Sequence, residues 1–212
     1  MIQNAPSLDL VEFIETKILP QYAAFDAAHN MEHVTRVIRH SLELVKVTGA
    51  DINMAYVIAA YHDLGMSGPR AIHHITGGKI LAADARLRKW FTSDQIKIMR
   101  EAVEDHRASA SHAPRSIYGK IVAEADRDIE TGTVIRRTIQ YGLANYPQLD
   151  HEGHWKRFME HMENKYSKDG YIRLWIPNSP NARRLNDLRN LIAQPRELRK
   201  EFDRIFAEES PT

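Results

Sequence analysis

The sequence has no cysteine, no long apolar run and no excess of charge of either sign. The absence of cysteine excludes a disulfide scaffold, thiolate zinc sites and a cysteine nucleophile. The longest mainly apolar stretch, around residues 54–61, is far shorter than the ~20 residues that a helix needs to cross a bilayer. The 29 Lys and Arg residues nearly balance the 28 Asp and Glu residues. We therefore expect no nucleic-acid partner and no membrane contact.

Basic residues are also missing from the start of the chain. The first is Lys17, and residues 1–19 are interrupted by Asp9, Glu12 and Glu15. A secretory leader combines an early positive charge with a continuous apolar segment. We therefore expect no leader, and the absence of thiols favours a soluble, cytoplasmic protein.

What the chain does have is apolar residues at three- and four-residue spacing along most of its 212 residues, which is typical of amphipathic helices. Capping and breaking residues divide this pattern. The first predicted helix is capped by Ser7, and the second runs from a turn near residues 27–30 to Gly49. Further helices are predicted from Asp51 to Gly65, over 71–87, from Thr92 or Ser93 to His106, from 121 towards Gln140, over 151–164 and over 181–206, the last with a break at Pro195. Residues 171–176 are the only strand-like stretch.

This pattern predicts an all-α fold. We expect a helical bundle over residues 1–145, with its motif core at 30–132. Residues 146–212 are expected to form a C-terminal helical extension that packs on the same domain and contains at most a short hairpin. The sequence leaves open whether the chain forms a homodimer.

Four ionisable side chains fall where the helical pattern predicts burial, namely His33, His62, His106 and Asp126. Burying a polar group without a partner costs about 2–7 kcal/mol, and burying a charge costs more. One such histidine is usually a satisfied core residue, but four groups on successive helices indicate a shared partner. Imidazole and carboxylate without sulfur suit a divalent ion such as Mn, Fe, Co, Ni, Mg or Zn.

His62 and Asp63 are neighbours in the sequence, which restricts how they can act together. Adjacent side chains on a helix diverge by about 100°. The two residues can therefore bind one ion only near a helix end, and Gly65 predicts an end at that point.

The order His33, His62-Asp63, Asp126 resembles the HD superfamily of metal-dependent phosphohydrolases, whose pattern is H…HD…D. The tetrapeptide HDLG at 62–65 is similar to the HD-[LI]-G turn of that family. The tripeptide ADR at 125–127 resembles a segment of several branches, including the guanosine polyphosphate hydrolases. The resemblance covers about residues 30–132.

The resemblance implies an all-helical bundle whose motif residues bind a divalent cation. Many members add two histidines between the HD pair and the last aspartate, often with a second metal ion. The implied ligands here are His33, His62, Asp63, Asp126, His74 and His106. His73 remains an alternative to His74, and we expect one or two ions.

The implied activity is hydrolysis of a phosphate ester of a small phosphorylated substrate, with a nucleotide favoured. Bound ions lower the pKa of a water molecule and place it in line with phosphorus. Asp63 and His62 are the expected catalytic residues, with Asp63 also accepting a proton from the water. The candidate phosphate anchors are Arg70, Lys79 and Arg107, for which ordinary solvated charge is the alternative.

Two other functions fit the same residues. One is a di-iron oxygenase of the HD type, because such proteins share the six-ligand pattern. The other is a non-catalytic HD module that senses a nucleotide. The intact ligand set argues against the sensor, because a sensor can lose a ligand without cost to folding.

Overall fold

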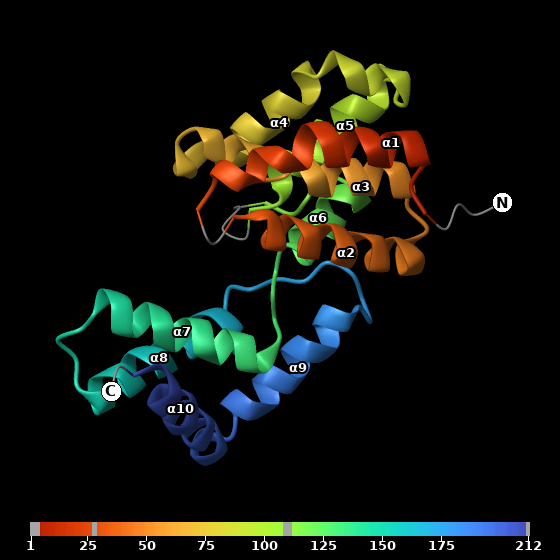
Figure 1. Ribbon diagram of the computed structural model, residues 1–212. Helices are drawn as coiled ribbons and strands as arrows, with labels where there is room; N and C mark the ends of the chain where they lie inside the picture. Colours follow the sequence, from red (N-terminus) through yellow and green to blue (C-terminus); the bar gives the residue numbers. More distant parts are fainter. Residues whose placement is uncertain (1–4, 27–28, 108–111, 211–212) are drawn as a thin grey trace. The chain divides into compact units, whose positions relative to one another are not determined.

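The computed structural model describes residues 5–26, 29–107 and 112–210, and it divides the chain into two compact units, Met1–Arg127 and Asp128–Thr212 (Figure 1). The prediction of an all-α fold is confirmed, because every regular element in the described residues is a helix. The boundary predicted after residue 145 falls at the end of a helix inside the second unit, whereas the structure divides the chain after Arg127.

The first unit is built around one buried helix, α3 (Ile52–Tyr61). Nine of its residues are buried, since its sequence is apolar on every side. The other α-helices of this unit are α1 (Leu8–Phe13), α2 (Met31–Thr48), α4 (His73–Ala83), α5 (Ser93–Asp105) and α6 (Ile117–Ala125). Helices α2, α5 and α6 pack against α3, and α4 packs against α5. Shorter π- and 3-10-helical segments lie at Ile14–Ile18, Leu19–Ala24, Leu64–Ser67, Arg70–Ile72 and Ala85–Lys89.

Capping and breaking residues in the sequence correctly predict several helix ends. The Asp51 carboxylate accepts a hydrogen bond from the Met54 amide and begins α3. Gly49 ends α2 with φ of 69°, a left-handed conformation that glycine adopts without strain. Thr92 and Gln95 form a capping box at the start of α5. The predicted helix over 71–87 is shorter, because α4 begins at His73 after a 3-10 turn and ends at Ala83.

The predicted continuous helix from residue 121 towards Gln140 is wrong. Helix α6 ends at Ala125, and α7 (Thr131–Asn145) begins after an irregular segment. The Glu130 carboxylate accepts hydrogen bonds from the amides of Gly132 and Thr133 and so starts the new helix. This break places Asp126 at the end of a helix, where its side chain is 26% exposed.

The second unit has its own hydrophobic core, formed by α7, α8 (His151–Tyr166), α9 (Pro180–Ile192) and α10 (Pro195–Glu209). The predicted break at Pro195 is confirmed, since a new helix begins there. Residues 171–176 form no strand. The amides of Tyr171 and Ile172 instead donate to the carbonyl groups of Asn164 and Lys165 at the end of α8, which leaves no strand partner for them.

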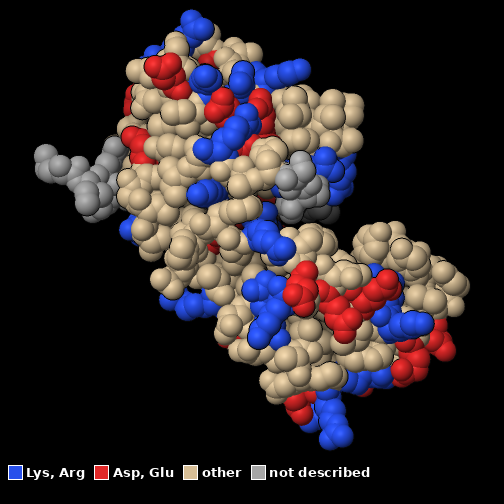
Figure 2. Space-filling model, turned by 180° about the vertical axis from the view of Figure 1, so that it is seen from behind, with Lys and Arg blue, Asp and Glu red and all other residues tan. Residues whose placement is uncertain are grey.

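Charged side chains of both signs are interspersed on the face of the molecule that Figure 2 shows, in keeping with the near-neutral composition. Charged side chains also pair along α10, for example Arg199 with Asp203 and Arg204 with Glu208. In the part of the chain that the structure describes, no helix combines the length and the apolar character needed to span a membrane.

Candidate metal centre

Glycines bring α4 close to the turn that carries His62 and Asp63. A Cβ atom on Gly65 would lie 1.9 Å from the His73 carbonyl oxygen, so only glycine fits there. A Cβ atom on Gly77 would lie 3.0 Å from the His62 carbonyl oxygen. This close packing places the first residue of α4, His73, opposite the end of α3.

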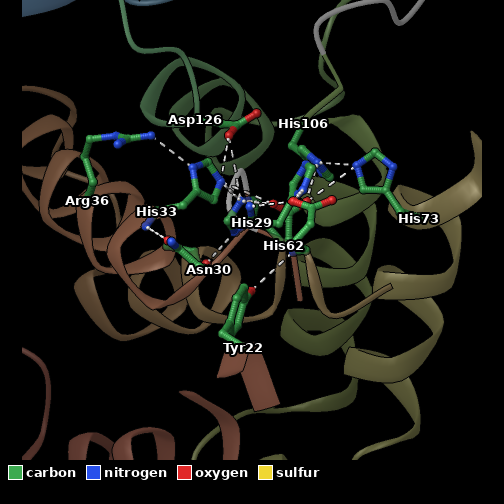
Figure 3. Close-up of polar contacts among 12 residues, drawn as sticks. Tyr22, His29, Asn30, His33, Arg36, His62, His73, His106 and Asp126 are labelled. Carbon is green, nitrogen blue, oxygen red and sulfur yellow. Dashed lines mark hydrogen bonds and ion pairs between the residues drawn. The ribbon is translucent and has the colours of Figure 1, made fainter. Parts of the chain in front are cut away.

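Imidazole and carboxylate groups from separate helices converge at the end of α3 (Figure 3). His33 comes from the first turn of α2, and His62 and Asp63 directly follow α3. His33 Nε2 and His62 Nε2 lie 3.1 Å apart. The Asp63 Oδ2 atom is 3.2 Å from the first and 3.1 Å from the second. Asp126 Oδ1 approaches the same two nitrogens at 3.2 and 3.8 Å.

The other oxygen of Asp63 faces a second pair of histidines. His73 Nε2 and His106 Nε2 are 3.1 Å apart, and each is 3.5 Å from Asp63 Oδ1. His106 follows α5 and is buried, as are His62 and Asp63. The Asp63 carboxylate thus lies between two histidine pairs and presents one oxygen to each.

Three of the four rings are held in the same way. The Nδ1 atoms of His62, His73 and His106 lie 2.6–2.7 Å from the carbonyl oxygens of the residues three positions earlier. A carbonyl can only accept a hydrogen bond, so each Nδ1 carries a hydrogen and donates it. In the neutral ring this leaves an Nε2 lone pair that points into the cluster.

His33 is oriented differently. The Asn30 side chain accepts a hydrogen bond from the His33 amide and starts α2. Arg36 Nη2 lies 3.0 Å from His33 Nδ1, where it donates to the ring while that nitrogen carries no hydrogen. Metal ligation through Nε2 moves the ring hydrogen to Nδ1, and protonation of the ring adds one there, so in either case the guanidinium must turn away from the ring.

The electrostatics of the cluster are strongly coupled. Burial of Asp63 opposes its ionisation, but the imidazoles of His62 and His106 outweigh burial and hold its pKa well below the usual range. Burial likewise opposes ionisation of Asp126, whereas the hydrogen bond from His33 helps to lower its pKa to about 2. Burial lowers the pKa of His33, but the carboxylates of Asp126 and Asp63 raise it to about 9. The two carboxylates are therefore anionic at neutral pH.

The donor set fits divalent ions. Two donors that lie about 2.1 Å from an octahedral ion and at right angles are about 3.0 Å apart, close to the separations within each histidine pair. Unprotonated Nε2 atoms and carboxylate oxygens that face one another repel unless a cation or protons lie between them. Among the residues that the structure describes, two groups are suited to a metal ion, His33-His62-Asp63 and Asp63-His73-His106.

The structure brings together most of the ligands expected from the sequence. These are His33, His62, Asp63, Asp126 and His106. His73 takes the place expected for His74. His73 is the first residue of α4, and the 3-10 turn before it supplies the Arg70 carbonyl that orients the His73 ring towards the cluster. His74 lies about 100° further around the helix. Its ring centroid is 5.6 Å from that of His73, and it lies outside both groups.

The three expected phosphate anchors have different surroundings. The Arg70 side chain is 70% exposed and lies 3.9 Å from Asp26. Arg107 Nη1 donates to the Ala71 carbonyl at 2.8 Å and so ties the end of α5 to the turn before His73. Lys79 is exposed on α4, about 240° around the helix and about 9 Å along it from His73. The structure therefore does not bring Lys79 to the cluster.

The sequence analysis did not single out Arg36 or Tyr22, whose side chains hydrogen-bond to residues of the cluster. Arg36 was detectable, since it follows His33 by one helical turn. Tyr22 was not, because its partners lie about 40 positions later in the chain. Its hydroxyl is fully buried, and burial together with the Asp63 charge raises the pKa of Tyr22 well above the usual value, so the hydroxyl keeps its proton.

Comparison with known protein families agrees with this geometry. Residues 30–129 match the family model described as the HD domain. This part of the chain is therefore similar to the HD domain, a helical fold whose members are generally metal-dependent hydrolases and bind divalent metals. A comparison with curated proteins found no match, and neither did a comparison with solved structures.

Proposed function

We propose that the chain is a metal-dependent phosphohydrolase that acts on a phosphate ester of a small molecule, with a nucleotide as the favoured substrate class. The observation that carries this proposal is the Asp63 carboxylate between two histidine pairs. The HD family match supports the reaction class. The choice of a nucleotide as the substrate class rests on the resemblance of the motif to nucleotide-cleaving branches of the family.

In this proposal His33, His62, Asp63, His73, His106 and Asp126 hold the metal. A divalent ion bound there lowers the pKa of a water molecule and withdraws charge from a phosphoryl oxygen. Asp63 is a ligand in this scheme, because a carboxylate with a strongly lowered pKa is a weak proton acceptor. The proposed phosphate contacts are Arg70 and Arg107. Arg70 lies in the turn three residues before His73, and Arg107 directly follows His106 and bonds to that turn.

The test combines metal analysis with a substrate screen. The purified chain is loaded with Mn²⁺ or Co²⁺ and assayed on phosphomonoesters, nucleoside triphosphates and cyclic dinucleotides. We expect turnover on at least one class, and loss of both metal and turnover in Asp63→Ala. The control is Asp187→Ala, an exposed position on α9. A protein with an occupied centre and no turnover on any of these substrates would contradict the proposal.

The shared carboxylate also supports a second candidate, a di-iron oxygenase. The same two donor groups suit two iron ions, since imidazole and carboxylate are common ligands of iron. Elemental analysis of untreated protein and oxygen uptake with candidate substrates separate the two reactions. Two irons per chain with substrate-dependent oxygen uptake would favour the oxygenase over the hydrolase.

A further inference from the structure

Tyr22 reaches the metal centre from a segment that precedes the HD domain match. It lies in the 3-10 helix Leu19–Ala24, and its side chain is 0% exposed. The Tyr22 hydroxyl donates a hydrogen bond to the Ala60 carbonyl at 2.9 Å. The same oxygen accepts a hydrogen bond from the Asp63 amide at 3.4 Å. One donor and one acceptor are within the capacity of a tyrosine hydroxyl.

These two bonds lie on either side of His62. The last carbonyl groups of a helix have no partner within the helix. At the end of α3, the Ala59 carbonyl accepts from the His62 ring and the Ala60 carbonyl accepts from Tyr22. The carbonyls that α3 leaves unpaired therefore orient one metal ligand and anchor the tyrosine.

Asp63 is the N-cap of the 3-10 helix Leu64–Ser67, with a φ of −106° and a ψ of 6°. Its backbone therefore marks the point where the chain leaves α3 and turns. The Tyr22 hydroxyl holds the amide of this residue, whose carboxylate faces both histidine pairs.

We propose that Tyr22 is a positioning residue of the metal centre, which fixes the backbone of the His62-Asp63 turn so that both oxygens of Asp63 face their histidine pairs. The segment before the HD domain match is then part of the functional centre. This role rests on the metal binding proposed above.

The test is the Tyr22→Phe variant, which removes only the hydroxyl, compared with Tyr61→Phe. Tyr61 is also fully buried, but its hydroxyl donates to Asp84 at 2.7 Å, away from the cluster. Metal affinity and stoichiometry are measured by titration of the metal-free protein with Mn²⁺ or Co²⁺. We expect Tyr22→Phe to bind metal roughly 10- to 100-fold more weakly. Tyr61→Phe should lose stability and retain the affinity of the wild type.

If Tyr22→Phe does not fold, hydrogen exchange of the wild-type protein tests the role of Tyr22 instead. Residues 19–24 contain no proposed ligand, and metal binding slows hydrogen exchange throughout the first unit because it stabilises the folded state. If Tyr22 is coupled to the centre, metal addition should slow the amides of residues 19–24 more than those of α1. Equal slowing in the two segments, or wild-type metal affinity in Tyr22→Phe, overturns the inference and leaves the proposed function intact. A wild-type chain that binds no metal overturns both.

Discussion

At the scale of single residues, His73 and His74 show how one position in a helix separates a ligand from its neighbour. His73 Nε2 points at His106 and Asp63, whereas His74 lies outside both donor groups. We expect His73→Ala to lose metal from the Asp63-His73-His106 group and to lower activity strongly. His74→Ala, the matched control, should keep the metal content of the wild type. Equal metal loss in the two variants, measured by elemental analysis, would argue against the assignment of His73.

The raised pKa of His33 predicts how the stability of the metal-free protein depends on pH. The ordinary pKa of 6.5 applies to the unfolded chain, and the folded value is about 9, with burial outweighed by Asp126 and Asp63. Folding therefore favours the protonated ring. The stabilisation is complete below about pH 6.5 and is lost as the pH rises through about 9.

Urea unfolding of the metal-free protein across this range measures the effect. We expect the free energy of unfolding to fall between the two values in the wild type and to change less in His33→Gln. His112→Gln, at an exposed position, is the control and should follow the wild type. A His33→Gln profile as steep as that of the wild type would contradict the expectation.

At the scale of elements, the packing of α4 against the turn at Leu64–Ser67 depends on Gly65. A Cβ atom there would overlap the His73 carbonyl oxygen at 1.9 Å, and backbone atoms cannot give way as a side chain can. We expect Gly65→Ala to lower the free energy of unfolding by about 3 kcal/mol and to weaken metal binding through displacement of His73. Gly68→Ala, whose Cβ atom would have no neighbour closer than 3.7 Å, should fold and bind metal normally. Circular dichroism during denaturation and metal titration compare the two variants.

The elements show which parts of the structure the sequence could predict. Apolar periodicity and caps such as Asp51 and Thr92 are local, so the helices and most of their ends followed from the sequence. The separation of α6 from α7 did not, because apolar spacing continues across the break and only the Glu130 cap marks it. The choice of His73 depends on a carbonyl supplied by the preceding turn. Tyr22 depends on a tertiary contact that no local pattern encodes.

At the scale of the whole molecule, the two units have separate apolar cores. A metal that binds only the folded first unit stabilises that unit, by about 2.7 kcal/mol at a free concentration 100 times the dissociation constant. We expect calorimetry of the full chain to show a transition that moves to lower temperature when a chelator is added, and a second that does not move. Two transitions that move together would show that the units unfold as one.

Asp63 presents one oxygen to each histidine pair, so the two donor groups His33-His62-Asp63 and Asp63-His73-His106 share it. Mutations of Asp63 and of a histidine therefore have unequal effects. Replacing His73 disables one half and leaves the other intact. Replacing Asp63 disables both at once. A substitution of a histidine therefore affects one of the two donor groups, whereas a single substitution at residue 63 removes a ligand from both.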